Sequence, residues 1–359
     1  MSPAHRRLLF ALIALLASGG IAMLAAELAL RFWGTTAEPR RHFRPGIYEP
    51  DAELGWRLQP AYQGGHVEHT FVAQTSTVAQ GFRQGGSSLT LEQAQLKVLA
   101  LGDSCTFGRG VADAETYPAQ LQQMLAAERA CVVNLGVPGY DTYQELGLLR
   151  RWIDPIHPQV LVLGWLPNDV LERSVATIPR VTICDGHLVE DQERYRRWKL
   201  KIGHQGWHRS ALYRYVNVAF KTFKARVGLN RKRTWQPERV LTPEALAYAA
   251  KPLRGIQELA QARGIRTIMV IFPRKEDLSR GKDRLDSYAS VVALGRDLGF
   301  EVLNLHVAWS EQTEALQWYL PRDQVHLTPA GYADVAQRVA KLIRGGASPP
   351  GQQLQPAVD

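Results

Sequence analysis

The chain has 359 residues, which is long enough for one large α/β domain with appendages or for two modest domains. With 45% hydrophobic and 21% charged residues, the composition excludes a wholly disordered chain, a collagen and a coiled coil, and three cysteines are too few for a disulfide scaffold. The formal net charge is +9, and an excess of this sign points to an anionic partner only where it is concentrated in one stretch.

The N-terminus carries the longest apolar run. Residues 8–30 contain a single charged residue, Glu27, and a helix of this length, rising about 1.5 Å per residue, crosses a hydrocarbon core of about 30 Å. A cleavable signal peptide and a buried core helix are the alternatives. The run is longer than a signal requires and lacks a good cleavage site, so the sequence predicts an uncleaved membrane anchor over residues 1–34. Basic residues flank both ends, so charge alone does not fix its orientation.

Residues 35–95 show no sustained hydrophobic period. Pro39, Pro45, Pro50 and Pro60 interrupt helices, and paired glycines mark turns. We therefore expect an extended strap that lies against the main domain.

Residues 96–344 alternate between strand-like and helix-like segments. This alternation predicts a three-layer α/β fold with a flavodoxin-like parallel sheet of about five strands and helices on both faces. A tail over 345–359, rich in Pro and Gln, is predicted to be disordered. The predicted strands are 98–101, 132–135, 160–163, 267–271 and 301–305, and the predicted helices are 117–127, 143–152, 243–263, 284–298 and 329–344.

Polar residues and glycines follow these strands. Ser104 follows the first strand, Gly139 the second and Asn168 the third, and Asp323 precedes His326 by three residues before the last helix. Taken singly, each segment is ordinary turn chemistry. Because functional loops gather at the carboxyl ends of parallel strands, the joint pattern predicts a nucleophile, oxyanion donors and a carboxylate-oriented base at one edge of the sheet.

These segments resemble the four blocks of the SGNH hydrolases, also called the GDSL-type esterase/lipase family. Gly-Asp-Ser at 102–104, the segment 134–139, the Asn-Asp pair at 168–169 and Asp-x-x-His at 323–326 carry the resemblance. The stretches 102–125, 133–149 and 326–340, together with Gly-Phe-Arg at 81–83, are similar to a bacterial, membrane-anchored branch of the family. Cys105 replaces the Leu or Phe usual after the serine, and the spacing from Gly164 to Asn168 is two residues longer than usual.

The resemblance implies acyl transfer through a covalent intermediate. It assigns Ser104 as nucleophile, His326 as general base and Asp323 as the group that orients the imidazole. The oxyanion hole would consist of the backbone N–H groups of Ser104 and Gly139 and the side-chain amide of Asn168. Asp103 would hold the nucleophile loop. We expect neither a cofactor nor a metal ion.

Most of the net charge lies between the third and fourth predicted strands. Residues 183–238 contain 13 Lys or Arg against five Asp or Glu, with interleaved aromatic residues. The stretch is predicted to be a helical insertion beside the Asn168 edge of the site. A solvated basic face and a contact with anionic lipid are the competing interpretations. Nucleic acid is not expected, because no nucleic-acid motif accompanies the charge.

We therefore predict a serine esterase tethered to a bacterial inner membrane by a single span, with a periplasmic or extracytoplasmic catalytic domain. Its substrate would be an ester: an acylated glycan, a lipid or a small ester. An O-acyltransferase that passes the same acyl group to a cell-envelope glycan is one alternative. A non-catalytic glycan- or lipid-binding module on the same fold is another. The sequence leaves open whether Cys131 and Cys184 pair.

Overall fold

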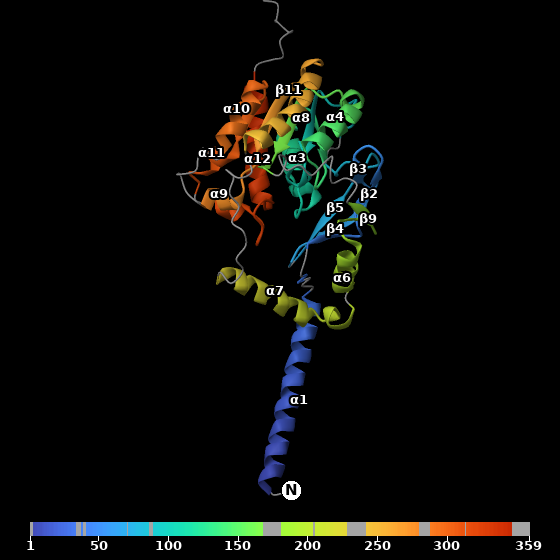
Figure 1. The fold of residues 1–359 in the computed structure, drawn as a ribbon, viewed down its shortest axis with the longest axis vertical. Coiled ribbons are helices and arrows are strands. Elements are labelled where there is room, and N and C mark those ends of the chain that lie inside the picture. The colour runs from blue at the N-terminus through green and yellow to red at the C-terminus, as the bar shows by residue number, and fades with distance from the viewer. Residues whose placement is uncertain are drawn as a thin grey trace, which may run out of the picture. The chain divides into compact units, whose positions relative to one another are not determined.

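The computed structural model describes residues 3–33, 37–38, 41–69, 71–85, 89–167, 181–203, 205–227, 242–279, 288–312 and 314–346 (Figure 1). They fall into two units. One comprises Met1–Phe43, Val67–Val72 and Asp191–Lys232, and the other comprises Arg44–His66, Ala73–Glu190 and Arg233–Asp359. We call them the N-terminal unit and the hydrolase unit, and each is described by itself.

A five-stranded parallel sheet forms the centre of the hydrolase unit. Its strand order is β12-β11-β8-β6-β7, the doubly wound order that the flavodoxin-like prediction requires. The central strands are rich in Val, Leu and Ile, because a parallel sheet covered on both faces buries most of its side chains. The strands are β6 Leu96–Gly102, β7 Ala130–Gly136, β8 Val160–Trp165, β11 Arg266–Ile271 and β12 Glu301–Asn304.

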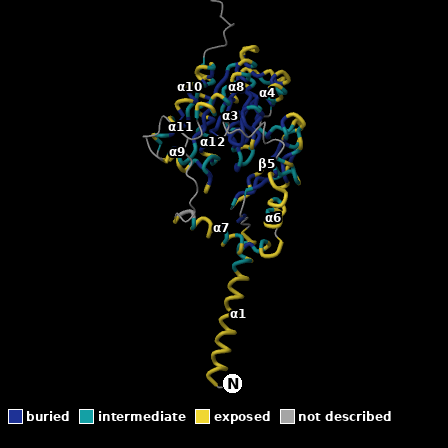
Figure 2. The backbone as a smooth tube through the Cα atoms, viewed as in Figure 1, coloured by how far each residue is buried: buried dark blue, intermediate teal, exposed yellow. Residues whose placement is uncertain are grey.

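Helices cover both faces of this sheet. Val98, Val162 and Val270 point into the core on the face covered by α3 and α12, which contact each other. Met269, one residue out of phase, points to the opposite face, where α10 packs and where α4 contacts α8. Figure 2 shows these strands as buried. The helices are α3 Tyr117–Met124, α4 Thr142–Ile156, α8 Pro243–Gln261, α10 Ala289–Asp297 and α12 Pro329–Gly345, with the short helices α2 Ser104–Phe107, α9 Lys275–Ser279 and α11 Leu305–Trp309.

All five predicted strands and all five predicted helices are present. The fifth strand ends at Asn304 instead of residue 305, because the Asn304 side chain accepts a hydrogen bond from His306 N at 3.0 Å and caps α11. The helix predicted over 284–298 is observed as Ala289–Asp297, and residues 280–287 lie outside the described part of the chain. The α/β fold class is confirmed.

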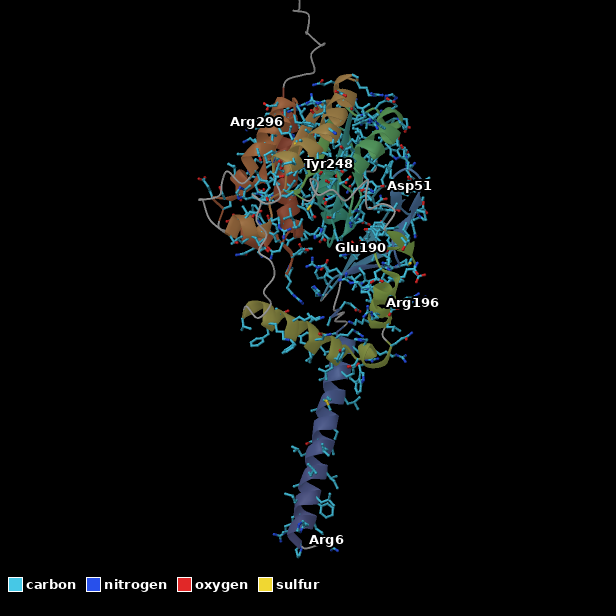
Figure 3. The ribbon with its side chains drawn as sticks, in the orientation of Figure 1. Arg6, Asp51, Glu190, Arg196, Tyr248 and Arg296 are labelled. Carbon is cyan, nitrogen blue, oxygen red and sulfur yellow. The ribbon has the colours of Figure 1, made fainter. Side chains whose placement is uncertain are left out.

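The strap, predicted over residues 35–95, contains the five short strands β1 to β5. The hairpin of β2 and β3 lies against α4, where the Arg151 guanidinium binds both carboxylate oxygens of Asp51 at 2.7 and 3.1 Å. Asp51 is labelled in Figure 3. A second hairpin of β9 and β10 turns at Asp185 and Gly186, both at positive φ, and Gly186 O accepts from Tyr48 N at 2.9 Å. The bounds are β1 His42–Arg44, β2 Tyr48–Asp51, β3 Gly55–Leu58, β4 Gln63–Val67, β5 Val72–Ser76, β9 Thr182–Cys184 and β10 His187–Val189.

The N-terminal unit contains a long apolar helix and part of the basic segment. Helix α1, Pro3–Phe32, has a mean hydropathy of 2.4 over its most apolar window, and none of that window is buried. In length and composition it fits either a membrane span or a signal sequence. The basic segment contributes α6 Gln192–Ile202, the 3-10 turn η4 Gly206–Arg209 and α7 Ala211–Arg226.

The sequence leaves a Cys131–Cys184 disulfide open and predicts a disordered tail. No disulfide joins Cys131 and Cys184, both of which the structure describes. Of the predicted disordered tail 345–359, residues 347–359 lie outside the described part of the chain, so that prediction remains untested.

Candidate active site

The predicted nucleophile lies at the carboxyl end of β6, the strand between β8 and β7. Gly102 ends the strand at φ +153°, and a Cβ there would come within 2.2 Å of Thr106 Oγ1, so the strand can only approach the next turn without a side chain. Asp103 caps α2 by accepting a hydrogen bond from Cys105 N at 2.9 Å. Ser104 is therefore the first residue of a short helix that follows the tight turn at Gly102 and is capped by Asp103. Its residue surface is 8% exposed.

The three predicted triad side chains form one hydrogen-bonded chain. His326 Nε2 lies 2.8 Å from Ser104 Oγ, and His326 Nδ1 lies 2.8 Å from Asp323 Oδ2. The carboxylate accepts the Nδ1 proton, which leaves the Nε2 lone pair directed at the serine hydroxyl. The structure thus brings together an alcohol and an imidazole that are 222 residues apart in the sequence.

The loop before α12 fixes the carboxylate. Asp323 Oδ1 accepts the backbone N–H groups of Val325 and His326 at 2.7 and 3.0 Å, while Oδ2 is left to the imidazole. Leu320 N donates to His326 O at 2.9 Å and closes the same turn. Because each oxygen already has a defined donor, the carboxylate can stabilise an imidazolium without reorganising.

Of the three predicted oxyanion donors, the structure describes Ser104 and Gly139. Gly139 follows β7 at φ +91°, a conformation that favours glycine. Among the described residues, neither the Ser104 N–H nor the Gly139 N–H has a hydrogen-bond acceptor, so both are available as donors. Asn168 lies outside the described residues, and its role in the oxyanion hole stays a prediction, as does the position of the basic insertion beside it.

The side of the site next to Gly139 is lined by apolar groups that the sequence reasoning did not single out. A Cβ on Gly139 would lie 3.6 Å from the Trp56 ring and 3.7 Å from Leu188 Cδ1. The Tyr140 hydroxyl donates to Trp56 O, and the two rings stack edge to face at 5.6 Å. Trp56 comes from the strap and Leu188 from the β9–β10 hairpin, so no local pattern marks either as a site residue.

A buried arginine supports the nucleophile loop from the strap. The Arg83 side chain is fully buried, and its Nε donates to Asp113 Oδ1 at 2.8 Å. Its Nη1 donates to the carbonyl oxygens of Phe107 and Gly108 at 3.2 and 3.1 Å, and its Nη2 donates to Val111 O at 2.8 Å. Burial lowers the pKa of Arg83, and the Asp113 carboxylate opposes that shift. In the sequence, Arg83 stood out only as the last residue of the Gly-Phe-Arg element.

Comparison with solved structures finds several low-identity likenesses. TesA matches with a TM-score of 0.42 and 14% identity over 69% of this chain and 98% of that chain. The lipase/acylhydrolase from Enterococcus faecalis matches with a TM-score of 0.41 and 15% identity over 72% and 100%. The psychrotrophic esterase EstA from Pseudoalteromonas sp. matches with a TM-score of 0.39 and 13% identity over 69% and 97%. No curated protein matches the chain.

The family model for the GDSL-like Lipase/Acylhydrolase family matches residues 100–333. This range covers more than half of the chain and contains the whole segment from the nucleophile loop to the first turn of α12. The chain therefore belongs to the GDSL-like lipase/acylhydrolase family and is an ester-bond hydrolase.

Proposed function

We propose that the protein is a membrane-tethered serine esterase that works through an acyl-serine intermediate on Ser104. The observation that carries this proposal is the continuous chain from Ser104 Oγ through the His326 imidazole to Asp323, with two contacts of 2.8 Å. Such a chain activates a serine hydroxyl, which is a weak nucleophile by itself.

In the first half-reaction, His326 Nε2 takes the hydroxyl proton as Ser104 Oγ attacks the ester carbonyl. The N–H groups of Ser104 and Gly139 and the Asn168 amide donate to the oxyanion of the tetrahedral intermediate. His326 then returns the proton to the leaving alcohol. Asp323 stays ionised throughout and stabilises the imidazolium that forms in between.

In the second half-reaction, water replaces the alcohol. His326 Nε2 accepts a proton from the water as it attacks the acyl-serine, and a second oxyanion forms at the same donors. Collapse of this intermediate releases the carboxylic acid and returns the proton to Ser104 Oγ.

Tethering is supported by helix α1, whose apolar window is fully exposed in the structure. An exposed apolar helix of this length is stable only inside a bilayer or against a partner. The protein would cross a bacterial inner membrane once, with the catalytic domain on the extracytoplasmic side, as the resemblance to the membrane-anchored branch implies. Its substrate would be an acylated glycan, a lipid or a small ester.

The test is hydrolysis of short and long p-nitrophenyl esters by the full-length protein in detergent micelles. Wild type should hydrolyse at least one of them, and Ser104→Ala should lose turnover by about 10⁶-fold or to background. Ser310→Ala serves as the matched control, because its hydroxyl bonds only within its own turn at Val307 O.

The same assay with an acceptor sugar distinguishes hydrolysis from transfer. Free carboxylic acid as the main product supports the esterase, whereas faster ester consumption with acylated sugar would show a transferase. Equal rates for wild type and Ser104→Ala would contradict both and leave a binding module.

A further inference from the structure

Glu27 is the only acidic residue in α1, and it binds the start of α7. Its Oε2 accepts hydrogen bonds from Ser210 Oγ and Leu212 N, both at 2.8 Å, and its Oε1 accepts from Ala211 N at 2.9 Å. Arg31, one turn further along α1, donates to the same carboxylate at 2.6 Å. An acid in an apolar helix is costly unless its oxygens are satisfied, and here the donors are the first N–H groups of α7. This carboxylate therefore joins the two helices at one level.

Glu27 lies near the C-terminal end of the apolar run over residues 8–30. From Leu8 to Glu27 the helix rises by about 28 Å at 1.5 Å per residue, close to the hydrocarbon thickness of about 30 Å. If Leu8 lies at one boundary of the hydrocarbon core, Glu27 and the start of α7 lie at the other. In Figure 1, α7 lies across the C-terminal end of α1.

One face of α7 is an exposed apolar stripe. Val216, Phe220 and Phe223 in α7, and Val227 directly after its last residue, are each between 49% and 56% exposed. At about 100° per residue these four side chains fall within about 60° of one another around the helix axis. Lys224 lies about 40° beyond the Phe220 edge of the stripe, and its Nζ is 4.6 Å from the centroid of the Phe220 ring, whereas Lys221 lies on the polar face, about 130° from the centre of the stripe. An apolar stripe with one lysine at its edge and another on the polar face is the pattern of a helix that lies in a membrane interface.

The start of α7, next to the stripe, lies against the apolar part of α1. Leu212, about 50° from the centre of the stripe, lines a groove together with Met23 and Leu24, which precede Glu27 in α1. Trp207, 83% exposed, lines the same groove. On the opposite side of α7, Arg214 Nε lies 4.0 Å from Oε1 of Glu38, a residue beyond the end of α1.

We propose that α7 lies in the membrane–water interface, with its stripe in the outer part of the hydrocarbon and its lysines among anionic phospholipid headgroups. Trp207 would lie at the same depth, where tryptophan is favoured. The inference rests on the proposed tethering by α1. It adds a second membrane contact, which fixes the N-terminal unit against the bilayer surface instead of leaving it on a single flexible stalk.

The test is depth-dependent fluorescence quenching of the full-length protein in vesicles of phosphatidylglycerol and phosphatidylcholine. In a Cys184→Ser background, in which the remaining cysteines are buried, the variants Phe220→Cys, Thr222→Cys and Leu16→Cys are labelled with an environment-sensitive dye. Thr222 is the matched control, because it is exposed about 130° from the centre of the stripe on the same helix. Retained hydrolysis of a soluble short ester shows that each variant is folded.

We expect shallow doxyl-lipid quenchers to reduce the emission at position 220 at least twofold, with little effect at 222. Deep quenchers should act at position 16. If positions 220 and 222 are quenched equally while 16 is quenched, the placement of α7 is wrong and the tether stands. If position 16 is not quenched either, the tether itself is wrong.

The charge contribution has its own arm. With both lysines present in the labelled Phe220→Cys protein, vesicles of phosphatidylcholine alone should give weaker quenching at 220 than vesicles that contain phosphatidylglycerol. Replacing both lysines, Lys221→Gln with Lys224→Gln, should remove that difference. Quenching at 220 that is the same in both vesicles before the lysines are changed would overturn the headgroup part of the proposal.

Discussion

Arg83 brings a full charge into the interior beside the nucleophile loop. Its guanidinium is the shared donor for three carbonyl groups between Phe107 and Val111 and for the Asp113 carboxylate. A methionine at this position would fill the space but remove the charged donor that these acceptors share, leaving Asp113 to Ser76 and the Phe107 and Gly108 carbonyls to long contacts of 3.5 and 3.4 Å, which is more costly than losing an exposed pair.

Arg83→Met should therefore lower the free energy of unfolding by about 3 kcal/mol and reduce kcat more than it raises KM, since the residues after Ser104 lose their support. Chemical denaturation and steady-state hydrolysis measure the two effects. Arg57→Met is the control: Arg57 is 48% exposed, binds Glu49 at 2.6 Å, and should cost less than about 1 kcal/mol. Equal losses in the two variants would show that Arg83 has no special role.

Asn168 tests the predicted oxyanion hole at the same scale. Asn168→Ala should lower kcat by about 10² to 10³-fold and leave KM nearly unchanged, because its amide would bind the oxyanion only as it forms. Ester hydrolysis over a range of substrate concentrations separates the two constants. A rise in KM with unchanged kcat would instead assign the side chain to substrate binding.

At the scale of elements, the strap is fastened to α4. Arg151 binds both oxygens of Asp51, and Gln144 Nε2 donates to Leu54 O at 2.8 Å. The same helix begins directly after the Gly139 loop, so contacts of the strap with α4 also support the loop that carries Gly139. The Arg151 hydrogen bonds lower the pKa of Asp51 to about 2.

Asp51 therefore makes stability depend on pH in the acid range. Its pKa in the folded protein lies below the ordinary value of about 3.9, so its contribution is fully present above about pH 5 and is lost as the pH falls toward 2. Wild type should lose about 2 kcal/mol more than Asp51→Asn between pH 5 and pH 2, as measured by urea denaturation. Asp154→Asn removes an exposed pair with Arg263 and should leave the acid profile close to wild type. Parallel profiles for wild type and Asp51→Asn would rule out the contribution.

At the scale of the whole molecule, the fate of α1 decides whether the enzyme is tethered. Protein extracted from membranes should have the full-length mass of 40.1 kDa and should stay with the membrane through high salt and alkaline carbonate, because an apolar helix does not dissociate when charges are screened. Mass spectrometry after such washes measures both properties. A mass reduced by an N-terminal fragment, with release into the soluble fraction, would show that α1 is a cleaved signal.

The order of the secondary structure could be predicted because it depends on local pattern. Apolar runs of strand length, such as the one around Val162, alternate with periodic segments capped by Thr116, Thr242 and Thr328, and each signal lies within a few neighbouring residues. The residues of the predicted triad could also be named, because each lies in a short motif and the sheet topology brings strand ends together.

The contacts between distant segments could not be predicted in this way. Nothing near Trp56 or Leu188 in the sequence indicates that both lie beside Gly139, and Gly-Phe-Arg does not show that Arg83 reaches the loop after Ser104. Glu27 looked like an isolated charge in an apolar run until the structure placed the first turn of α7 against it. The sequence by itself determined the order of the elements and the reaction class, and it named the residues of the predicted triad, since short-range sterics and side-chain chemistry specify them. The tertiary structure alone decided which strap and hairpin side chains line the site and what the buried charges bind, because burial and hydrogen-bond partners depend on chain segments far apart in sequence.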